Sequence, residues 1–349
     1  MDKPSGFRGR GSENNPKNRF EKVERVPEPE ADETSSPVTQ FLPDASKSII
    51  AYNDSPDVGF DASINPYRGC EHGCIYCYAR PTHEYLGFSA GLDFETRIMV
   101  KRDAPQLLRK ELSGPRWKPQ VLASSGVTDC YQPIEKKLQL TRQCLEVLVE
   151  FRNPVIIITK NHLVTRDIDL LAELTHYNCA AVFVSVTTLD EKLSGLMEPR
   201  ASRPARRLAA IASLARAGVP VGYLQAPMIP GLTDSEAPAI AEAAAKAGAR
   251  YAGYVPLRLP HAVKDLFEEW LERNYPERKQ KILNRIRAIR GGGLNDPNFH
   301  SRMRGEGVYA EQMAELFRVA RKKAGFEERS PDLTTEHFRR PREQLKLFG

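Results

Sequence analysis

Three cysteines stand close together in residues 69–78, which read Gly-Cys-Glu-His-Gly-Cys-Ile-Tyr-Cys-Tyr. Cys70, Cys74 and Cys77 are separated by three and then two residues, so one short loop can direct all three thiols at one metal group. Thiolates are soft ligands that suit iron–sulfur clusters, and a four-iron cluster needs a ligand on each iron. Three cysteines therefore leave one iron free to bind another molecule.

Two other uses of these cysteines compete with a cluster. A disulfide is disfavoured because the chain shows no secretory pattern at its start and has only six cysteines in 349 residues. A structural zinc site needs a fourth ligand, and only His72 and His83 lie nearby in the sequence. The sequence favours the cluster over both alternatives.

Composition indicates a globular, intracellular protein of one large domain or two smaller ones. Hydrophobic residues make up 41% of the chain, but no run of about 18 apolar residues suggests a membrane span. We therefore expect a cytoplasmic protein without membrane contact. The net charge is +6, and residues 278–349 carry 17 basic and 9 acidic side chains. Either this region attracts a polyanion such as nucleic acid, or the charges cover solvated helix faces.

Short β-branched runs alternate with amphipathic stretches from Ile64 onward, which predicts a parallel sheet covered by helices. We expect strands at residues 62–67, 120–125, 155–159, 180–186, 220–226 and 251–257. We expect helices near residues 103–113, 136–151, 166–175, 202–217 and 234–247. A βα barrel carries its functional residues after the C-terminal ends of its strands, and the cysteine loop follows the first expected strand.

Four regions are predicted along the chain. Residues 1–58 are rich in Pro, Glu and Ser and lack apolar periodicity, so we expect a disordered N-terminal tail. A barrel over residues 59–260 is followed by a helical extension over 261–326, with helices near 262–274, 277–290 and 309–323. Residues 327–349 form a flexible tail in this interpretation.

The cysteine spacing, with an aromatic residue before the third cysteine, resembles the signature of the radical S-adenosylmethionine (SAM) enzymes. In that superfamily the amino and carboxylate groups of SAM bind the fourth iron. The phrases at residues 65–70, 128–133, 198–200 and 226–231 resemble the spore photoproduct lyase-like branch, many of whose bacterial members are uncharacterised. The resemblance covers about residues 60–260. It implies an α/β fold, a partial (β/α)6 TIM-like barrel, with a four-iron, four-sulfur (4Fe-4S) cluster and SAM as cofactors.

The branch is named for an enzyme that reverses a methylene-bridged thymine dimer in DNA. The resemblance implies that the reduced cluster cleaves SAM and that the resulting 5′-deoxyadenosyl radical abstracts hydrogen from substrate, here a DNA lesion. A reductase or a flavodoxin-type protein would donate the electron. Radical SAM chemistry on protein, RNA or a small metabolite is the alternative, and a non-enzymatic iron–sulfur protein ranks last.

One departure from the lyase concerns its hydrogen-donating cysteine, which lies near the end of the second strand. This chain has Ser124-Ser125-Gly126 there, and Cys130 follows a few residues later. Cys130 is either a donor acting from a different place or a small buried core residue. This missing cysteine is the main reason to keep substrates other than a DNA lesion open.

The resemblance also implies roles for polar residues that follow the strands. The loop with Ser125, Thr128 and Asp129 would contact the SAM amino group, and Tyr76 would either pack toward adenine or only fill its loop. Independently of the resemblance, the hydroxyl of Ser185 at the end of the fourth strand suits a ribose. Glu198 and the arginines after it, first Arg200, either clamp the SAM carboxylate or form a surface salt bridge.

The end of the chain carries a separate signal. Gln344, Leu345, Leu347 and Phe348 resemble the short peptide by which bacterial DNA polymerases and repair proteins bind the replication sliding clamp. Exposed Leu and Phe side chains on a tail usually fit a pocket of a partner. Such short matches are common, so the other interpretation is a tail that folds back on its own barrel.

Overall fold

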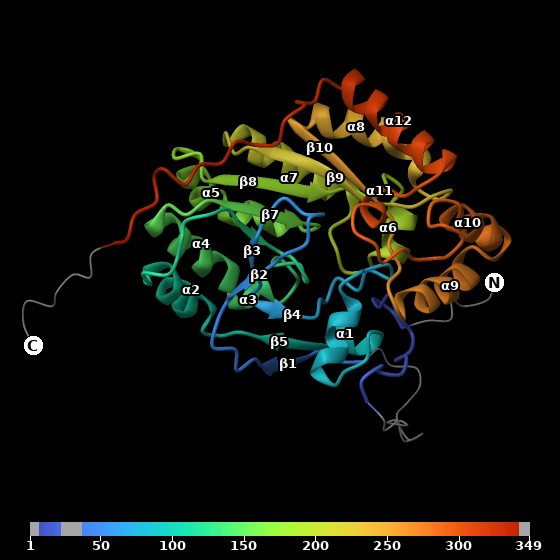
Figure 1. Ribbon diagram of the computed structural model, residues 1–349, viewed down its shortest axis with the longest axis horizontal. Helices are drawn as coiled ribbons and strands as arrows, with labels where there is room; N and C mark the ends of the chain where they lie inside the picture. The colour runs from blue at the N-terminus through green and yellow to red at the C-terminus, as the bar shows by residue number, and fades with distance from the viewer. Residues whose placement is uncertain (1–6, 22–36, 342–349) are drawn as a thin grey trace, which may run out of the picture.

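The computed structural model describes residues 7–21 and 37–341. Its centre is a seven-stranded sheet with the strand order β10-β9-β8-β7-β6-β3-β2 (Figure 1). Six of these strands run parallel in chain order. They are β3 (Ala62–Ile64), β6 (Leu122–Ser124), β7 (Val155–Thr159), β8 (Ala180–Ser185), β9 (Val221–Met228) and β10 (Tyr251–Pro256). All six expected strands are confirmed, and the order fits a partial barrel of parallel βα units.

Helices connect the parallel strands because each carries an apolar face that packs on the sheet. The expected ones are confirmed as α2 (Ala104–Ser113), α4 (Leu140–Phe151), α5 (Ile168–Thr175), α7 (Pro204–Arg216) and α8 (Ala237–Lys246). The helix expected over 136–151 is broken at Gln139, whose φ is 55°, and so begins with a separate turn, α3 (Glu135–Leu138). Further short elements are η1 (Arg80–Leu86), α1 (Leu92–Thr96), η2 (His162–Asp167), α6 (Glu191–Met197) and η3 (Asp234–Glu236).

Two strands lie in the region that the sequence assigned to a tail. β2 (Ile50–Tyr52) pairs antiparallel with β3 and extends the main sheet. β1 (Gln40–Pro43), β5 (Arg97–Val100) and β4 (Tyr67–Arg68) form a second sheet. The expectation of disorder over 1–58 is therefore wrong for residues 7–21 and 37–58. Both segments bond to the barrel, because the N–H of Ser12 donates to Glu95 and the N–H of Ile49 donates to Glu111, at 2.9 and 2.7 Å.

The helical extension is confirmed and lies behind the cysteine loop. It comprises α9 (Val263–Asn274), α10 (Pro276–Ala288), α11 (Ser301–Arg304) and α12 (Val308–Lys323). Apolar residues of α9 and α10, including Trp270 and Ile282, share one hydrophobic cluster with Ile75 and Tyr76. α12 packs beside α8 at the edge of the main sheet (Figure 1).

The chain after α12 continues along the barrel. Thr334 and Arg339 donate backbone hydrogen bonds to Asn178 and Phe151, so residues up to 341 are less free than the expected flexible tail. The clamp-like residues Gln344, Leu345, Leu347 and Phe348 lie outside the described part of the chain. Across the described ranges, no helix is both long and apolar enough to cross a membrane.

Candidate active site

The cysteine loop follows β3 and the short strand β4, at the C-terminal edge of the sheet. Cys70 and Cys74 are buried and Cys77 is partly buried, and all three line a cavity of about 120 Å³. The backbone N–H of Ile75 donates to the carbonyl of Met197, at 3.0 Å, and so ties the loop to the end of α6. Gly73 has a φ of 67°. That conformation favours glycine and lets the loop turn between its ligands.

A buried ion pair supports the cysteine loop. Arg80 and Glu95 lie 2.5 Å apart and are completely buried. Arg80 also donates to the carbonyl of Cys74, at 3.0 Å. The backbone N–H groups of Gly11 and Ser12 donate to the Glu95 carboxylate, at 3.0 and 2.9 Å. The N-terminal segment therefore helps to hold the cysteine loop in place.

The other walls of the cavity come from the loops after the next strands, as the barrel rule predicts. The loop after β6 supplies one wall, β7 and the residues after it a second, and the end of β8 a third. The structure thus brings together these expected site residues: Cys70, Cys74, Cys77, Ser125, Thr128, Asp129 and Ser185.

Asp129 is the anionic group of this cavity. Its carboxylate accepts hydrogen bonds from the Thr159 hydroxyl and the Lys160 backbone N–H, both at 2.8 Å, and lies 3.3 Å from Nδ1 of His72. Burial alone would raise the pKa of Asp129, but His72 and the backbone donors lower it to about 2. The carboxylate is therefore ionised at neutral pH and can attract a cationic group.

The hydroxyls of Ser125 and Thr128 are engaged with the backbone. Oγ of Ser125 accepts from the N–H of Cys130, at 3.0 Å, and the Thr128 hydroxyl donates to the carbonyl of Gly69, at 2.6 Å. Thr128 thereby joins the loop after β6 to the start of the cysteine loop. Both residues shape the cavity as well as facing it.

Tyr76 lies behind the cysteine loop in the hydrophobic cluster with α9 and α10. Its hydroxyl donates to Oε1 of Glu198, which also accepts from the Thr187 hydroxyl, at 2.9 Å. Tyr76 is absent from the cavity lining, whereas Lys160 Nζ, on the cavity side, lies 5.9 Å from its ring centroid. This placement favours loop packing over the expected contact with adenine.

Glu198 and Arg200 do not pair with each other, because each forms an ion pair with another residue. Glu198 forms its ion pair with Arg207, which lies near the start of α7, and both side chains are at most 1% exposed. Burial would raise the pKa of Glu198, but Arg207 and Lys160 hold it below its usual value. Arg200 instead pairs with Glu71, at 3.2 Å, and its N–H donates to the carbonyl of His72. Both acidic residues therefore hold the loop, and neither is free to clamp a ligand.

Lys160 is a site residue that the sequence reasoning missed. It directly follows β7 and lines the cavity, and its Nζ donates to the carbonyl of Ala226, at 3.1 Å. The sequence feature that indicates Lys160 is its position, because Thr159-Lys160-Asn161 is a polar run at the C-terminal end of a predicted strand. Lys160 brings an ammonium group to a cavity whose other polar groups are thiols, hydroxyls, the Asp129 carboxylate and the His72 imidazole.

Cys130 lies in the main hydrophobic core and has no exposed surface. It does not line the cavity, and burial raises the pKa of its thiol well above the ordinary value. The structure therefore favours the core interpretation of Cys130. His83 is also structural, because Nε2 lies 2.9 Å from the carbonyl of Arg97 and its ring packs near Phe88 and Phe94.

The three thiols fit a cluster better than a single ion. In the described ranges, no group of three or more His, Cys, Asp or Glu side chains is arranged to hold one metal ion. Cluster ligands bind separate irons and need not converge on one point. Burial raises the pKa of Cys70, Cys74 and Cys77, so their thiolates need a nearby cation, which iron supplies.

Comparisons with known proteins assign this chain to a family. Residues 64–244 match the family model of the radical SAM superfamily. An uncharacterised Mycobacterium tuberculosis protein is 35% identical over 248 residues, which cover 70% of this chain and 72% of the relative. An uncharacterised Methanocaldococcus jannaschii protein is 30% identical over 223 residues, covering 64% and 79% of the two chains.

A solved structure shows the same fold. Spore photoproduct lyase, complexed with dinucleoside spore photoproduct, matches with a TM-score of 0.52 and 16% identity, covering 82% of this chain and 80% of that one. The family model spans more than half of this chain, including all three cluster cysteines. The chain belongs to the radical SAM superfamily, whose members use a 4Fe-4S cluster and SAM.

Proposed function

We propose that this protein cleaves SAM reductively and abstracts a hydrogen atom from a nucleic-acid substrate, a lesion in DNA. One observation carries the radical chemistry. Three buried or partly buried thiols face a cavity whose remaining walls are polar residues at the C-terminal ends of β6, β7 and β8. When bound there, the cluster and SAM supply the 5′-deoxyadenosyl radical that abstracts hydrogen.

The residues of this chain divide the binding of the cofactors between them. Cys70, Cys74 and Cys77 would hold three irons and leave the fourth for SAM. The ionised carboxylate of Asp129 suits a cationic group of SAM, and the Lys160 ammonium suits its carboxylate. Ser185 offers a hydroxyl at the third wall of the same cavity, where a ribose can form hydrogen bonds.

The surroundings of the loop close the site on its buried side. Behind the cysteines lie the apolar side chains shared with α9 and α10, and below them lies the buried pair of Arg80 and Glu95. A radical formed at the cysteines is therefore shielded from water on the buried side of the site. None of these residues has to exchange a proton, because hydrogen-atom abstraction needs no general base.

Two observations support DNA as the substrate. The fold is that of spore photoproduct lyase, and residues 278–349 carry a surplus of basic side chains that suits a polyanion. One observation favours the alternative of a protein, RNA or small-metabolite substrate. Ser124-Ser125-Gly126 ends the second barrel strand without a cysteine, and Cys130 is buried in the core.

We place the reaction in the cytoplasm, where thiols stay reduced and a reductase or flavodoxin-type protein can deliver the electron. The C-terminal residues Gln344, Leu345, Leu347 and Phe348 would bring the enzyme to DNA by binding the sliding clamp. A motif of one polar and three apolar side chains on a tail suits a hydrophobic pocket on such a partner.

The test of the substrate is the yield of 5′-deoxyadenosine from anaerobically reconstituted protein with SAM and reductant. Ultraviolet-irradiated DNA, undamaged DNA and no DNA are compared. A higher yield with irradiated DNA, and not with undamaged DNA, supports a DNA lesion as the substrate. If neither DNA sample changes the yield of 5′-deoxyadenosine, the substrate belongs to another class of molecule.

The amount of repaired product, measured in the same reactions, tests Cys130 against a matched control. Cys144 is another buried cysteine that does not line the cavity. We expect Cys130→Ala and Cys144→Ala to respond alike to irradiated DNA. A loss of repaired product that is confined to Cys130→Ala would make Cys130 a hydrogen donor.

A further inference from the structure

Arg258 lies between the cysteine cavity and a second, larger hollow. Its guanidinium lies over the ring of Tyr78, with Cζ 5.5 Å from the ring centroid, and Tyr78 lines the cysteine cavity. On another side, Nη1 of Arg258 lies 3.4 Å from Sδ of Met303. Met303 lines the second hollow. One arginine thus touches a wall of each space.

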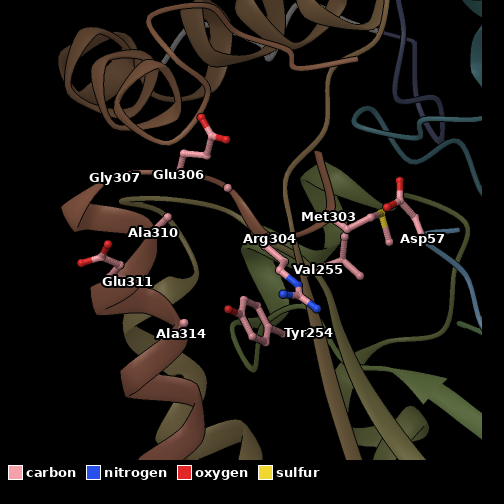
Figure 2. Close-up of a pocket in the computed structure, with 11 residues that line it drawn as sticks. Asp57, Tyr254, Val255, Met303, Arg304, Glu306, Gly307, Ala310, Glu311 and Ala314 are labelled. Atoms are coloured by element: carbon pink, nitrogen blue, oxygen red, sulfur yellow. The ribbon is translucent and has the colours of Figure 1, made fainter. Parts of the chain in front are cut away.

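The second hollow has a volume of about 720 Å³. It is lined by Tyr254 and Val255 of β10, by Met303 and Arg304 of α11, and by residues before and along the first turns of α12, which include the carboxylates of Glu306 and Glu311. Figure 2 shows the side chains of Arg304 and Tyr254 pointing into this space, with Asp57 beside Met303. The hollow is several times larger than the cysteine cavity and offers room for part of a substrate.

Arg258 lacks a partner for its charge. Among the residues that the structure describes, no carboxylate lies within ion-pair distance of Arg258, and its buried Nε has no hydrogen-bond partner. The neighbouring Arg302 is different, because it forms an ion pair with Asp57. Burial and the charge of Arg302 lower the pKa of Arg258. A buried donor without a partner is costly, so such groups often await a ligand.

Arg290 shows what a structural arginine looks like in the same region. Its guanidinium donates to backbone carbonyls of Leu257, Pro256 and Arg302, at 2.6, 3.1 and 2.8 Å. These bonds satisfy its donors and join β10 to α11. Among the described residues, the Arg258 guanidinium contacts the thioether sulfur of Met303 and lies over the Tyr78 ring, and no ion pair fixes it, so fold maintenance does not account for its charge.

We propose that Arg258 binds a phosphodiester oxygen of the nucleic-acid substrate, with the rest of that nucleotide in the second hollow. Arginine offers planar, parallel donors that match two phosphate oxygens, and the Tyr78 ring holds the plane in place. The contact positions the substrate next to the residue that follows the third cluster cysteine. This inference rests on the proposed action on nucleic acid.

The test measures binding of a fluorescently labelled, short oligothymidylate by anisotropy, with the full-length reconstituted protein under anaerobic conditions. Arg258→Gln should weaken binding about tenfold, because it removes a hydrogen bond to a charged group. The slope of log affinity against log salt should fall by about 0.7, the value for one contact to single-stranded DNA. Arg258→Lys should restore the salt slope and only part of the affinity.

Arg216→Gln is the matched control, because Arg216 is exposed on α7 and, among the described residues, its side chain bonds to Ser213 of its own helix. Iron content and thermal unfolding confirm that each variant folds, and Arg258→Lys still tests the idea if the Gln variant does not. Wild-type affinity and salt slope in Arg258→Gln would overturn the assignment of Arg258 alone. No binding by the unmodified protein would overturn the action on nucleic acid, and this inference with it.

Discussion

The carboxylate of Glu198 and the guanidinium of Arg207 form an ion pair that is almost completely sealed from solvent behind the cysteine loop. Tyr76 and Thr187 donate further hydrogen bonds to the same carboxylate. The pair therefore connects the aromatic residue of the cysteine motif to the end of β8 and to α7.

Removing one partner of this pair should be costly. Glu198→Gln leaves the Arg207 charge buried without a counter-charge, so the free energy of unfolding should fall by about 3–5 kcal/mol. Urea unfolding of Glu198→Gln, Arg207→Met and the double variant measures this. Because the second change removes the stranded charge, the double variant should lose less stability than the sum of the two single losses. Strictly additive losses would contradict a coupled pair.

Gly11 should control the stability of the cluster loop from a distant part of the sequence. A β-carbon added at Gly11 would lie 1.8 Å from the carbonyl oxygen of Gly73. Gly11→Ala should therefore force the N-terminal segment away from the loop and cost about 1–3 kcal/mol, as overpacking does. The reconstituted Gly11→Ala variant should also lose iron faster, and the decrease in its visible absorbance measures this loss.

Gly59→Ala is the control for this change, because a β-carbon there meets no atom within 4 Å. Equal iron retention in the Gly11 and Gly59 variants would show that the N-terminal segment does not support the loop.

Contacts between residues far apart in the sequence separate the features of this protein that local patterns predict from those that they do not. The six parallel strands and the cysteine site depend on local patterns, namely β-branched runs and the spacing of Cys70, Cys74 and Cys77. The place of residues 7–21 depends on a carboxylate about 80 residues away, Glu95, which no local pattern indicates. The choice of Arg207 over Arg200 by Glu198 depends on how α7 packs, since both arginines follow the glutamate closely.

His83 should make stability depend on pH. Burial lowers its pKa to about 4 from the ordinary value of 6.5. The unfolded chain therefore binds a proton at a higher pH than the folded protein. The stabilisation from neutral His83 is complete above pH 6.5 and is lost as pH falls toward 4, by about 3 kcal/mol.

Comparison with His83→Gln isolates this contribution from the carboxylates that titrate in the same range. Urea unfolding between pH 7.5 and 4 should show a smaller loss of stability in the variant than in the unmodified protein. Parallel curves for the two proteins would mean that His83 is not buried in its neutral form.

The C-terminal motif should bind the sliding clamp independently of the radical chemistry. Phe348→Ala removes the apolar side chain that would fill the clamp pocket, so clamp capture in a pull-down should fall at least tenfold, as for loss of an aromatic anchor. SAM cleavage should stay unchanged. Lys346→Ala is the control, because Lys346 occupies the variable position of the motif. Capture of the clamp by Phe348→Ala at the unmodified level would show that this motif does not bind the clamp.

In the proposed function, Cys70, Cys74 and Cys77 hold a cluster that cleaves SAM. The most direct test compares 5′-deoxyadenosine formation by the anaerobically reconstituted full-length protein with that of Cys74→Ala and Cys179→Ala. Cys179 is a buried cysteine at the start of β8, away from the cavity lining. We predict product from the unmodified protein and from Cys179→Ala, and none from Cys74→Ala. Product from Cys74→Ala at the unmodified level, or none from any of the three, would contradict the account.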